Sequence, residues 1–571
     1  MSAGAQGPAA AAAAAAAAEQ RREELFAEWL AKNHNTARYW AAATGGLIGL
    51  FVVSHWSQNL YSRHLSRKPN ALRSTVRAIA KPIQRLSTAR SLGPITILPE
   101  KVTLAMVYFA INAALTFYDA PQQAPMKTML SKRFGWMSLL NLLFTVFLGL
   151  KNTPLSPLAG YSFDSLNILH RCVGYTTILY MILHSTTYTA FLFESGFQSV
   201  LAEPKEYAGA VSGFAMLALL ATSIGPVRKR FYEIFYASHI ILVAIIIIAL
   251  GLHRPEYMLK AFIITTLSGA LWLFDQAFRL SRWIYHGHNS TVTLQPLPGN
   301  ATLVKFSKPI TAAPGSSVFL WIPSIRKFQR HPFTLVSASP QATFLIKSRN
   351  GFTKSLYDTA CKNPGVPLKA SLEGPYGHVP NVHNNYEKVV LIAGGSGVTF
   401  TMALALEWLK KRKTPKDMRK LEFYWCVRNQ EFLEWFEEEF KELRKETERV
   451  SVRVFCTCNN AGDEGSDESE TSSLEKESIG GDEEKLGLRH LNLSRVAVRG
   501  SGEEVRRIES GGRPDVRTLV SNAMEGLSED DRVLVAACGP EGLLNDVRKA
   551  VAVSRVAKAP SIEMFLEEFS F

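Results

Sequence analysis

Apolar side chains gather in seven long runs in the first half of the chain, separated by polar and basic stretches. A helix that crosses the hydrocarbon core of a bilayer needs roughly 20 predominantly apolar residues, and most of these runs approach that length. The third run is shorter than the others. The pattern predicts seven membrane-spanning helices, at residues 39–56, 102–118, 137–150, 166–191, 207–224, 231–252 and 259–278.

The second half has a different pattern. Between residues 290 and 373, short β-branched and aromatic runs such as 317–322 and 343–347 are broken by Pro and Gly, which predicts a small antiparallel β-barrel. After Lys388 strands and helices alternate, which indicates a parallel sheet of the Rossmann type. The predicted strands are 389–392, 422–427, 450–456 and 532–537, and the predicted helices are 399–411 and 431–445.

These patterns divide the chain into four parts. Residues 1–36 form an N-terminal tail, which lacks the basic start, apolar core and cleavage site of a signal peptide. The other three parts are a membrane bundle at 37–280, a β-barrel domain at 288–380 and an α/β domain at 386–571. Within the last domain, residues 459–485 are acidic and almost without apolar side chains, which predicts a disordered surface insertion.

The net charge of +14 could indicate nucleic-acid binding, but its distribution points to membrane lipid instead. Eight Lys and Arg residues lie between residues 63 and 90, in the loop after the first span, and three more lie at 228–230. Short basic loops stay on the cytosolic side of a membrane. We therefore expect the N-terminus outside, everything after Arg279 in the cytosol, and no nucleic-acid partner.

The six cysteines are scattered, without CxxC or zinc-site spacing, so that no disulfide framework is indicated. This usage suits domains in a reducing cytosol.

Four histidines stand inside the apolar runs in two pairs with one spacing. His170 and His184 are fourteen positions apart, and so are His239 and His253. Fourteen helical residues make close to four turns and roughly 21 Å, so both members of a pair face one side of their helix. Ionisable side chains inside a bilayer are costly and usually functional, and neutral imidazole is a strong axial ligand for haem iron. Zinc is the competing interpretation, but ligands this far apart cannot share one ion.

The loop charges also predict how the histidines pair. Spans four and six both start from the cytosol and run parallel, so His170 should face His239 near the inner side and His184 should face His253 near the outer side. The sequence thus predicts two separate bis-histidine sites for haem b.

His331, Pro332, Phe333 and Thr334 follow a strand-like run. This segment resembles the flavin-binding motif of the ferric reductase and NADPH oxidase family of membrane flavocytochromes. The resemblance extends from about residue 102 to the C-terminus and is closest to fungal ferric-chelate reductases. It implies a ferredoxin-reductase-like module, in which Phe333 lies against the FAD ring and the hydroxyl of Thr334 hydrogen-bonds to it.

The stretch that follows resembles the family's diphosphate-binding turn. Gly351 allows close approach of the backbone, Thr353 and backbone amides can donate, and Lys347 or Arg349 adds positive charge. The expected contacts with FAD are Lys347, Gly351, Phe352 and Thr353.

Glycine-rich motifs of the α/β domain resemble the NADPH-binding half of the same family. The loop at 394–399 follows a strand and opens a helix, which is the context that a phosphate loop requires. Cys538 would lie near the nicotinamide, and Arg428 and Arg513 are candidates for contact with the nucleotide. The motif residues are Gly374, Pro375, Tyr376, Gly377, Gly394, Gly395, Ser396, Gly397, Thr399, Cys538, Gly539 and Pro540.

The final aromatic, Phe571, resembles the residue that covers the flavin face in the ferredoxin-reductase superfamily. The resemblance implies that Phe571 is a gate which the nicotinamide displaces.

The resemblance implies a multi-pass protein, in the plasma membrane, that passes electrons from cytosolic NADPH through FAD and two haems to an extracellular ferric or cupric chelate. An NADPH oxidase that makes superoxide is the alternative enzyme. Oxidases of this family have a second histidine pair shorter by one residue and usually lack the first span, so both features favour the metalloreductase. A seven-span receptor or transporter is the non-enzymatic alternative, and the flavin and nucleotide motifs argue against it.

Overall fold

The computed structural model describes residues 8–60, 100–119, 126–160, 163–254, 258–383, 386–410, 419–446, 448–457, 507–510, 513–528, 531–556 and 560–568. Three predicted features lie outside these ranges: the basic loop at 63–90, the acidic insertion at 459–485 and Phe571.

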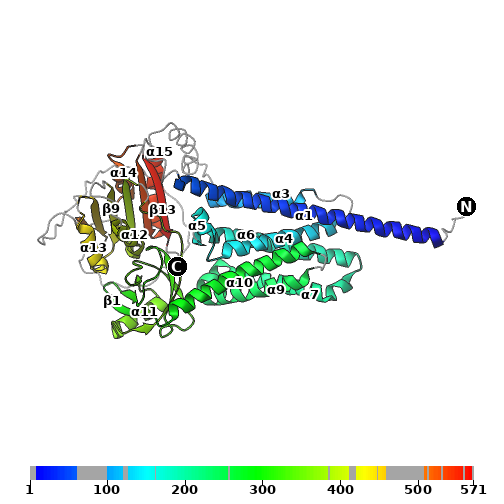
Figure 1. The fold of residues 1–571 in the computed structure, drawn as a ribbon, viewed down its shortest axis with the longest axis horizontal. Helices are drawn as coiled ribbons and strands as arrows, with labels where there is room; N and C mark the ends of the chain where they lie inside the picture. The colour runs from blue at the N-terminus through cyan, green and yellow to red at the C-terminus, as the bar shows by residue number, and fades with distance from the viewer. Residues whose placement is uncertain are drawn as a thin grey trace, which may run out of the picture.

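The first half of the chain is helical throughout its described residues. Long helices lie side by side in a bundle, and the β-containing domains lie at one end of it (Figure 1). The helices are α1 (Pro8–Leu60), α3 (Glu100–Phe117), α4 (Met126–Gly149), α5 (Leu155–Ala159), α6 (Phe163–Glu194), η2 (Gln198–Ala202), α7 (Pro204–Ser223), α8 (Gly225–Arg230), α9 (Tyr232–His253) and α10 (Leu259–Gly287).

All seven predicted spans fall on helices, but they differ in length and apolarity. Among the described residues, three helical segments are long and apolar enough to cross a membrane, in α6, α9 and α10, and the apolar part of α3 is shorter. The helix α1 is continuous for 53 residues, so the expected boundary between a tail and a first span at residue 36 is not a break in structure. Its N-terminal end continues past the other helices, away from the β domains (Figure 1).

The β domain after α10 forms two small antiparallel sheets instead of one closed barrel. One sheet has the order β5-β2-β1-β6 and the other has the order β4-β3-β7. Both enclose one apolar core that includes Phe306, Phe344 and Phe352. The elements are β1 (Thr291–Leu297), β2 (Ala301–Phe306), β3 (Ser317–Trp321), β4 (His331–Thr334), β5 (Thr343–Lys347), α11 (Phe352–Lys362), β6 (Leu368–Lys369) and β7 (Ser371–Tyr376).

The last domain is a parallel sheet with helices on both faces. Its strand order is β11-β10-β9-β8-β12-β13, and all neighbours run parallel. The elements are β8 (Lys388–Gly394), η3 (Gly395–Gly397), α12 (Val398–Lys410), β9 (Lys420–Val427), η4 (Gln430–Phe436), α13 (Glu437–Arg444), β10 (Val450–Cys456), β11 (Arg507–Ser510), α14 (Val516–Met524), β12 (Arg532–Gly539), α15 (Glu541–Val556) and β13 (Ser561–Glu568).

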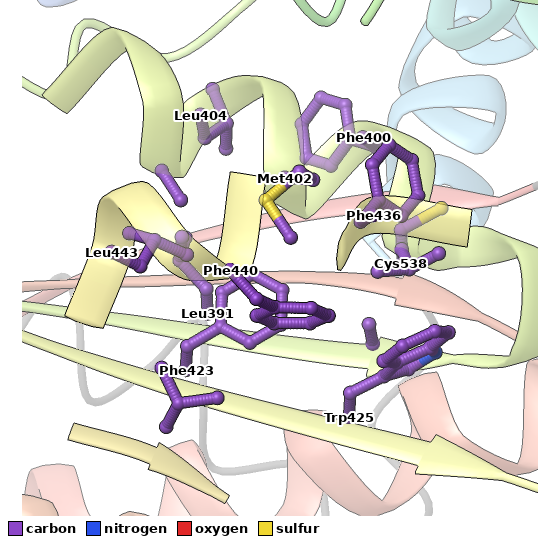
Figure 2. Packing of buried hydrophobic residues seen from close by; sticks show 14 of the residues in the cluster. Leu391, Phe400, Met402, Leu404, Phe423, Trp425, Phe436, Phe440, Leu443 and Cys538 are labelled. Carbon is purple, nitrogen blue, oxygen red and sulfur yellow. The ribbon is translucent and has the colours of Figure 1, made fainter. Parts of the chain in front are cut away.

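Aromatic side chains fill the space between this sheet and the helices α12 and α13. Figure 2 shows Phe400 from α12 and Phe440 from α13 above Phe423 and Trp425 of β9. Trp425 and Phe440 stack with ring centroids 5.8 Å apart. The other face is covered by α14 and α15, which pack their own apolar cluster on the sheet. Because both faces are covered, β8 is buried along its whole length, as expected for a central parallel strand.

Candidate functional site

The four predicted histidines meet in two pairs inside the bundle. The ring centroids of His170 and His239 are 6.3 Å apart, and those of His184 and His253 are also 6.3 Å apart. The pairs join α6 to α9, so these two helices run parallel with matching depths. The structure therefore brings together the same partners that the loop charges predict.

Backbone carbonyl groups orient three of the four rings. Nδ1 of His170 donates to the carbonyl oxygen of Thr145 at 2.9 Å, and Nδ1 of His184 donates to that of Ser131 at 2.7 Å. Nδ1 of His253 donates to the carbonyl oxygen of Lys205 at 2.9 Å. A carbonyl oxygen can only accept, so these contacts fix the proton on Nδ1 and leave Nε2 as the free ligand atom.

A glycine faces each of these three rings. A Cβ atom on Gly149 would lie 3.0 Å from Nδ1 of His170, and one on Gly135 would lie 3.1 Å from Nδ1 of His184. One on Gly209 would lie 2.6 Å from Nδ1 of His253. Each histidine ring can thus lie this close to the neighbouring backbone because glycine has no Cβ atom.

The residues present fit two bis-histidine haem sites. Two metal–imidazole bonds of about 2 Å each, together with the two half-rings, account for a centroid separation of the observed size. Among the described residues, no group of three or more His, Cys, Asp or Glu side chains surrounds one point. A protein zinc site needs such a group.

A buried ionic cluster joins the bundle to the β domain, and we call it the Glu373 hub. It consists of Glu373, Arg279, Arg330, Lys151 and Tyr376. The carboxylate of Glu373 accepts from Nε of Arg279 at 2.7 Å, from Arg330, and from the hydroxyl of Tyr376 at 2.9 Å. Nζ of Lys151 lies 4.0 Å from the same carboxylate. Only 1% of the Glu373 side chain is exposed.

The hub also reaches a histidine helix. Arg279 donates to the hydroxyl of Tyr236 at 2.7 Å, and Tyr236 lies one turn before His239 on α9. Two further contacts hold the same junction: Gln329 to Glu233 at 3.2 Å, and the hydroxyl of Ser371 to the Trp283 carbonyl at 2.6 Å. The position of the β domain is thus fixed relative to the inner histidine pair.

The hub sets the protonation of its own members. Burial by itself raises the pKa of Glu373, but the charges of Arg279, Lys151 and Arg330 and the hydrogen bond from Arg279 outweigh it, so the pKa lies below its ordinary value of 4.5. Burial and the charge of Arg279 lower the pKa of Lys151 to about 7, against the opposing effect of Glu373. Glu373 is therefore ionised at neutral pH and anchors both arginines.

The flavin motif lies on β4, where alternate side chains point to opposite faces. His331 and Phe333 both stack on Phe352, with centroids 4.7 and 6.2 Å apart, and Phe333 packs against the domain core. Pro332 and Thr334 therefore lie on the other face of the strand. Thr334, rather than Phe333, is the motif residue that this geometry turns away from the core.

The diphosphate turn lies at the N-terminus of α11. Gly351 has φ 64°, and no heavy atom lies within 4 Å of a Cβ built on it. The amide of Arg349 donates to the hydroxyl of Thr353 at 2.9 Å, which shapes the turn. Free amides at a helix N-terminus attract phosphate. The side chain of Phe352 is buried in the core, so a contact between Phe352 and a cofactor would be made by its backbone.

One further member of the flavin motifs and two glycines of the expected NADPH motif also belong to this domain. Nζ of Lys347 lies 5.0 Å from the ring centroid of Phe432, across the boundary to the α/β domain. Gly374 and Gly377 both have positive φ, and Gly377 is open to space.

The glycine-rich segments meet where the strand order of the parallel sheet reverses. β8 and β12 are neighbours, and their carboxyl ends lead into Gly394 and Gly539. A Cβ on Gly539 would lie 3.0 Å from the amide nitrogen of Gly394, and one on Gly397 would overlap the Cys538 carbonyl. The carboxyl ends of strands at such a switch point form the usual nucleotide crevice of this fold class.

Three further candidates lie around this crevice. Arg428 and Arg513 are both exposed, and Arg513 is close enough to act on the pKa of Cys426, which burial raises to about 12. Both arginines are therefore near the carboxyl end of β9. Cys538 is fully buried, and burial raises the pKa of its thiol well above the ordinary value. Burial thus favours the protonated form of this thiol.

Sequence patterns did not reveal the Glu373 hub, because its members are far apart in the chain. Glu373 directly precedes the predicted glycine motif, but nothing local marks Arg279 as its partner. The sequence could have predicted the glycines that contact His170 and His184, because Gly135 and Gly149 repeat the fourteen-residue spacing of these histidines.

Three family models match successive parts of the chain. Residues 134–250 match the ferric reductase like transmembrane component, residues 286–380 match an FAD-binding domain, and residues 386–552 match the ferric reductase NAD binding domain. The first match includes His170, His184 and His239.

Fungal reductases are similar to most of the chain. Ferric reductase transmembrane component 6 of Saccharomyces cerevisiae is 23% identical over 77% of this chain and 60% of its own length. Ferric/cupric reductase transmembrane component 1 of Candida albicans is 24% identical over 76% and 56%. The probable cell surface ferric reductase kap2 of Aspergillus oryzae is 27% identical over 64% and 52%. The chain thus matches between half and two thirds of these relatives' lengths.

A flavohemoglobin from Malassezia yamatoensis covers 78% of this chain and 98% of its own, at 16% identity and a TM-score of 0.34, which is too low to assign a fold. The three family models and the fungal relatives agree with the family suggested by the sequence motifs. Between residues 134 and 552, the chain contains the transmembrane, FAD-binding and NAD-binding domains of the ferric reductase family.

Proposed function

We propose that this protein is a transmembrane ferric-chelate reductase that takes electrons from cytosolic NADPH and delivers them to a ferric or cupric chelate outside the cell. The observation that carries the proposal is the pair of histidine sites at one separation, each joining α6 to α9. A soluble flavin reductase would not need ligands stacked along two membrane helices. A receptor or transporter would not need them beside FAD- and NAD-binding domains.

The bound groups divide the chemistry: NADPH supplies a hydride, FAD converts it to single electrons, and haem iron carries one electron at a time. His170 with His239, and His184 with His253, would hold two haem b groups, with Nε2 of each ring as the ligand atom. The carbonyls of Thr145, Ser131 and Lys205 keep three of these rings in the required tautomer. These hydrogen bonds also hold the three rings in their orientation.

The β domain binds FAD by its turn and by β4. Gly351 and the first amides of α11 receive the diphosphate, with Lys347 or Arg349 adding charge. Thr334 offers a hydroxyl to the flavin ring. The hub then holds this domain against α9 and α10, close to the inner histidine pair.

The α/β domain binds NADPH at the switch point between β8 and β12. Gly395, Ser396 and Thr399 receive its phosphates. Arg428 and Arg513 lie near the end of β9, where a 2′-phosphate distinguishes NADPH from NADH. The neutral thiol of Cys538 borders the nicotinamide site without taking part in bond formation.

We place the protein in the plasma membrane, and a relative named as a cell surface reductase supports this location. With seven crossings and cytosolic basic loops, both cofactor-binding domains lie inside. Outward movement of an electron is favoured by a negative interior, by roughly 2.3 kcal/mol per 100 mV across the full field.

The decisive experiment uses intact cells that produce the protein. We expect NADPH-dependent reduction of an impermeant ferric chelate, followed with an Fe(II)-specific dye, and a haem b signal in the reduced-minus-oxidised spectrum of the membranes. Superoxide is measured in parallel, because its production in place of ferric reduction would identify the oxidase. Membranes without a haem signal would contradict the whole scheme.

A further inference from the structure

One of the four histidines lacks the contact that orients the other three. Nδ1 of His239 is buried and has no hydrogen-bond partner among the described residues, whereas its three counterparts each donate to a backbone carbonyl. A ligating histidine almost always donates its second ring nitrogen to some acceptor, which fixes the tautomer and raises the basicity of the ligand.

The repeat along the helices locates the group that faces His239. On α4, the residue whose carbonyl accepts each hydrogen bond and the glycine beside the ring are four residues apart, at Ser131 and Gly135 and again fourteen residues later at Thr145 and Gly149. On α7 the same arrangement, Lys205 with Gly209, faces His253.

Because Lys205 at the start of α7 meets His253 at the end of α9, these neighbouring helices run antiparallel. Fourteen residues further along α7 are Leu219 and Ser223, and fourteen residues back along α9 is His239. By this register Leu219 and Ser223 face His239.

The fourth position differs from the other three in two ways. The carbonyl oxygen of Leu219 already accepts the hydroxyl of Thr222 at 3.1 Å. A serine stands where the other positions have glycine, and its Oγ is buried without a partner among the described residues. Nδ1 of His239 and Oγ of Ser223 are therefore both buried and without a hydrogen-bond partner among the described residues, and the helix register places them at the same level.

We propose that Ser223 is the positioning residue for the inner haem ligand, with its Oγ accepting the hydrogen bond from Nδ1 of His239. Glycine Cβ positions at the three equivalent sites lie 2.6–3.1 Å from the ring nitrogen, so a hydroxyl carried there is within reach after rotation about χ1. The inference rests on the proposed function, since it assigns a role in holding the inner haem.

The test is Ser223→Ala in the full-length, haem-loaded protein, followed by redox titration of the haem absorbance. We expect two steps in the wild type. In the variant only the inner step should move to more positive potential, and the inner haem should pass to apomyoglobin roughly tenfold faster. The same titration in a His184→Ala background, which keeps only the inner site, shows which of the two redox steps belongs to the inner haem. Ser223→Thr, which keeps the hydroxyl, should restore both values.

Ser238→Ala is the matched control. Ser238 lies beside the ligand on α9, but its hydroxyl is bonded to the carbonyl of Phe235 in its own helix, so both steps should stay unchanged. If the wild type shows two haem steps and Ser223→Ala leaves both potentials unchanged, this inference alone is overturned. It is also overturned if Ser223→Thr shifts the inner potential as far as Ser223→Ala does. A wild type without two haem steps overturns the proposed function and this inference with it.

Discussion

At the scale of single residues, backbone atoms do work that is usually assigned to side chains. The three oriented histidines donate to main-chain carbonyls and lie against glycines. Substituting the side chains of Ser131, Thr145 or Lys205 leaves the acceptor in place, so the histidines themselves are the residues whose removal is informative.

Replacing His184 by Ala should remove the outer haem and leave the inner one bound, because the two ring pairs share no ligand. Haem content per protein, measured as pyridine haemochrome, should fall by about half. His34→Ala is the control, since His34 lies edge-on to Trp136 in the same bundle but in neither pair. Full haem content in His184→Ala would falsify the assignment.

Replacing Glu373 by Gln should loosen the β domain from the bundle. Removing one partner of a buried ion pair costs roughly 3–5 kcal/mol, because the remaining charge is left unpaired. We expect NADPH to reduce the flavin at a normal rate and the haems at least about tenfold more slowly. Anaerobic stopped-flow absorbance separates the two steps. Glu407→Gln, at a more exposed ion pair with His383, should leave both rates unchanged.

The same carboxylate predicts a dependence on pH. Its pKa is lower in the folded protein than in the unfolded chain, so the unfolded chain binds more protons between the two values. Stability from the hub is present above the ordinary value of 4.5 and is lost as the pH falls through the lower, folded value. Thermal unfolding between pH 7 and pH 3.5 should show this loss in the wild type, and a curve of the same shape for Glu373→Gln would rule out the hub as its source.

At the scale of elements, α4 and α6 carry matching repeats. Ligands, carbonyl acceptors and glycines all recur after fourteen residues, which is close to four turns. The two sites are therefore related by a shift along the helix axes, and their alignment depends on the number of residues between them.

Inserting one alanine between His170 and His184 should disrupt one haem site, because each added residue rotates the rest of the helix by about 100°. The expected result is a protein that binds at most one haem, counted by redox titration. An alanine inserted into the run at residues 9–18 of α1 serves as the control for added length. Two normal haem steps in the α6 insertion would show that the helix register does not define the sites.

The elements show what local sequence can and cannot predict. The strands 343–347 and 450–456 were predicted at the bounds observed for β5 and β10, and both follow from apolar runs with turn residues at their ends. The histidine pairing was predictable because helical periodicity is local. The Glu373 contact with Arg279 joins residues 94 positions apart, and the split of the β domain into two sheets depends on packing. Neither the ion pair nor the two-sheet arrangement produces a periodic pattern in the sequence.

At the scale of the whole molecule, two of the family matches begin at junctions between structural parts. The FAD-binding match covers the two antiparallel sheets, and the NAD-binding match begins just before β8. Contacts across the first junction are ionic and buried, so the parts are joined by a fixed geometry as well as by the chain.

Deleting the acidic stretch at residues 459–485 should leave NADPH oxidation intact. The segment lies outside the described residues, and its composition cannot bury enough apolar surface to form part of a core. We expect normal turnover with a soluble electron acceptor and an unchanged melting temperature. Loss of NADPH oxidation at normal expression would show that the segment contributes to the nucleotide site. Deletion of β13, which pairs with β12 along its length, should abolish folding and provides the contrasting control.

The long helix α1 touches both ends of the molecule. Its Trp29 lies under Nζ of Lys132 at 4.6 Å, and its His55 meets His378 of the β domain with ring centroids 6.1 Å apart. A helix rises about 1.5 Å per residue, so these contacts are about 39 Å apart along one rigid rod. A bilayer with its headgroups is about 40–45 Å thick. The rod cannot shorten, so α1 holds these two contacts at a fixed separation that is close to the thickness of a bilayer.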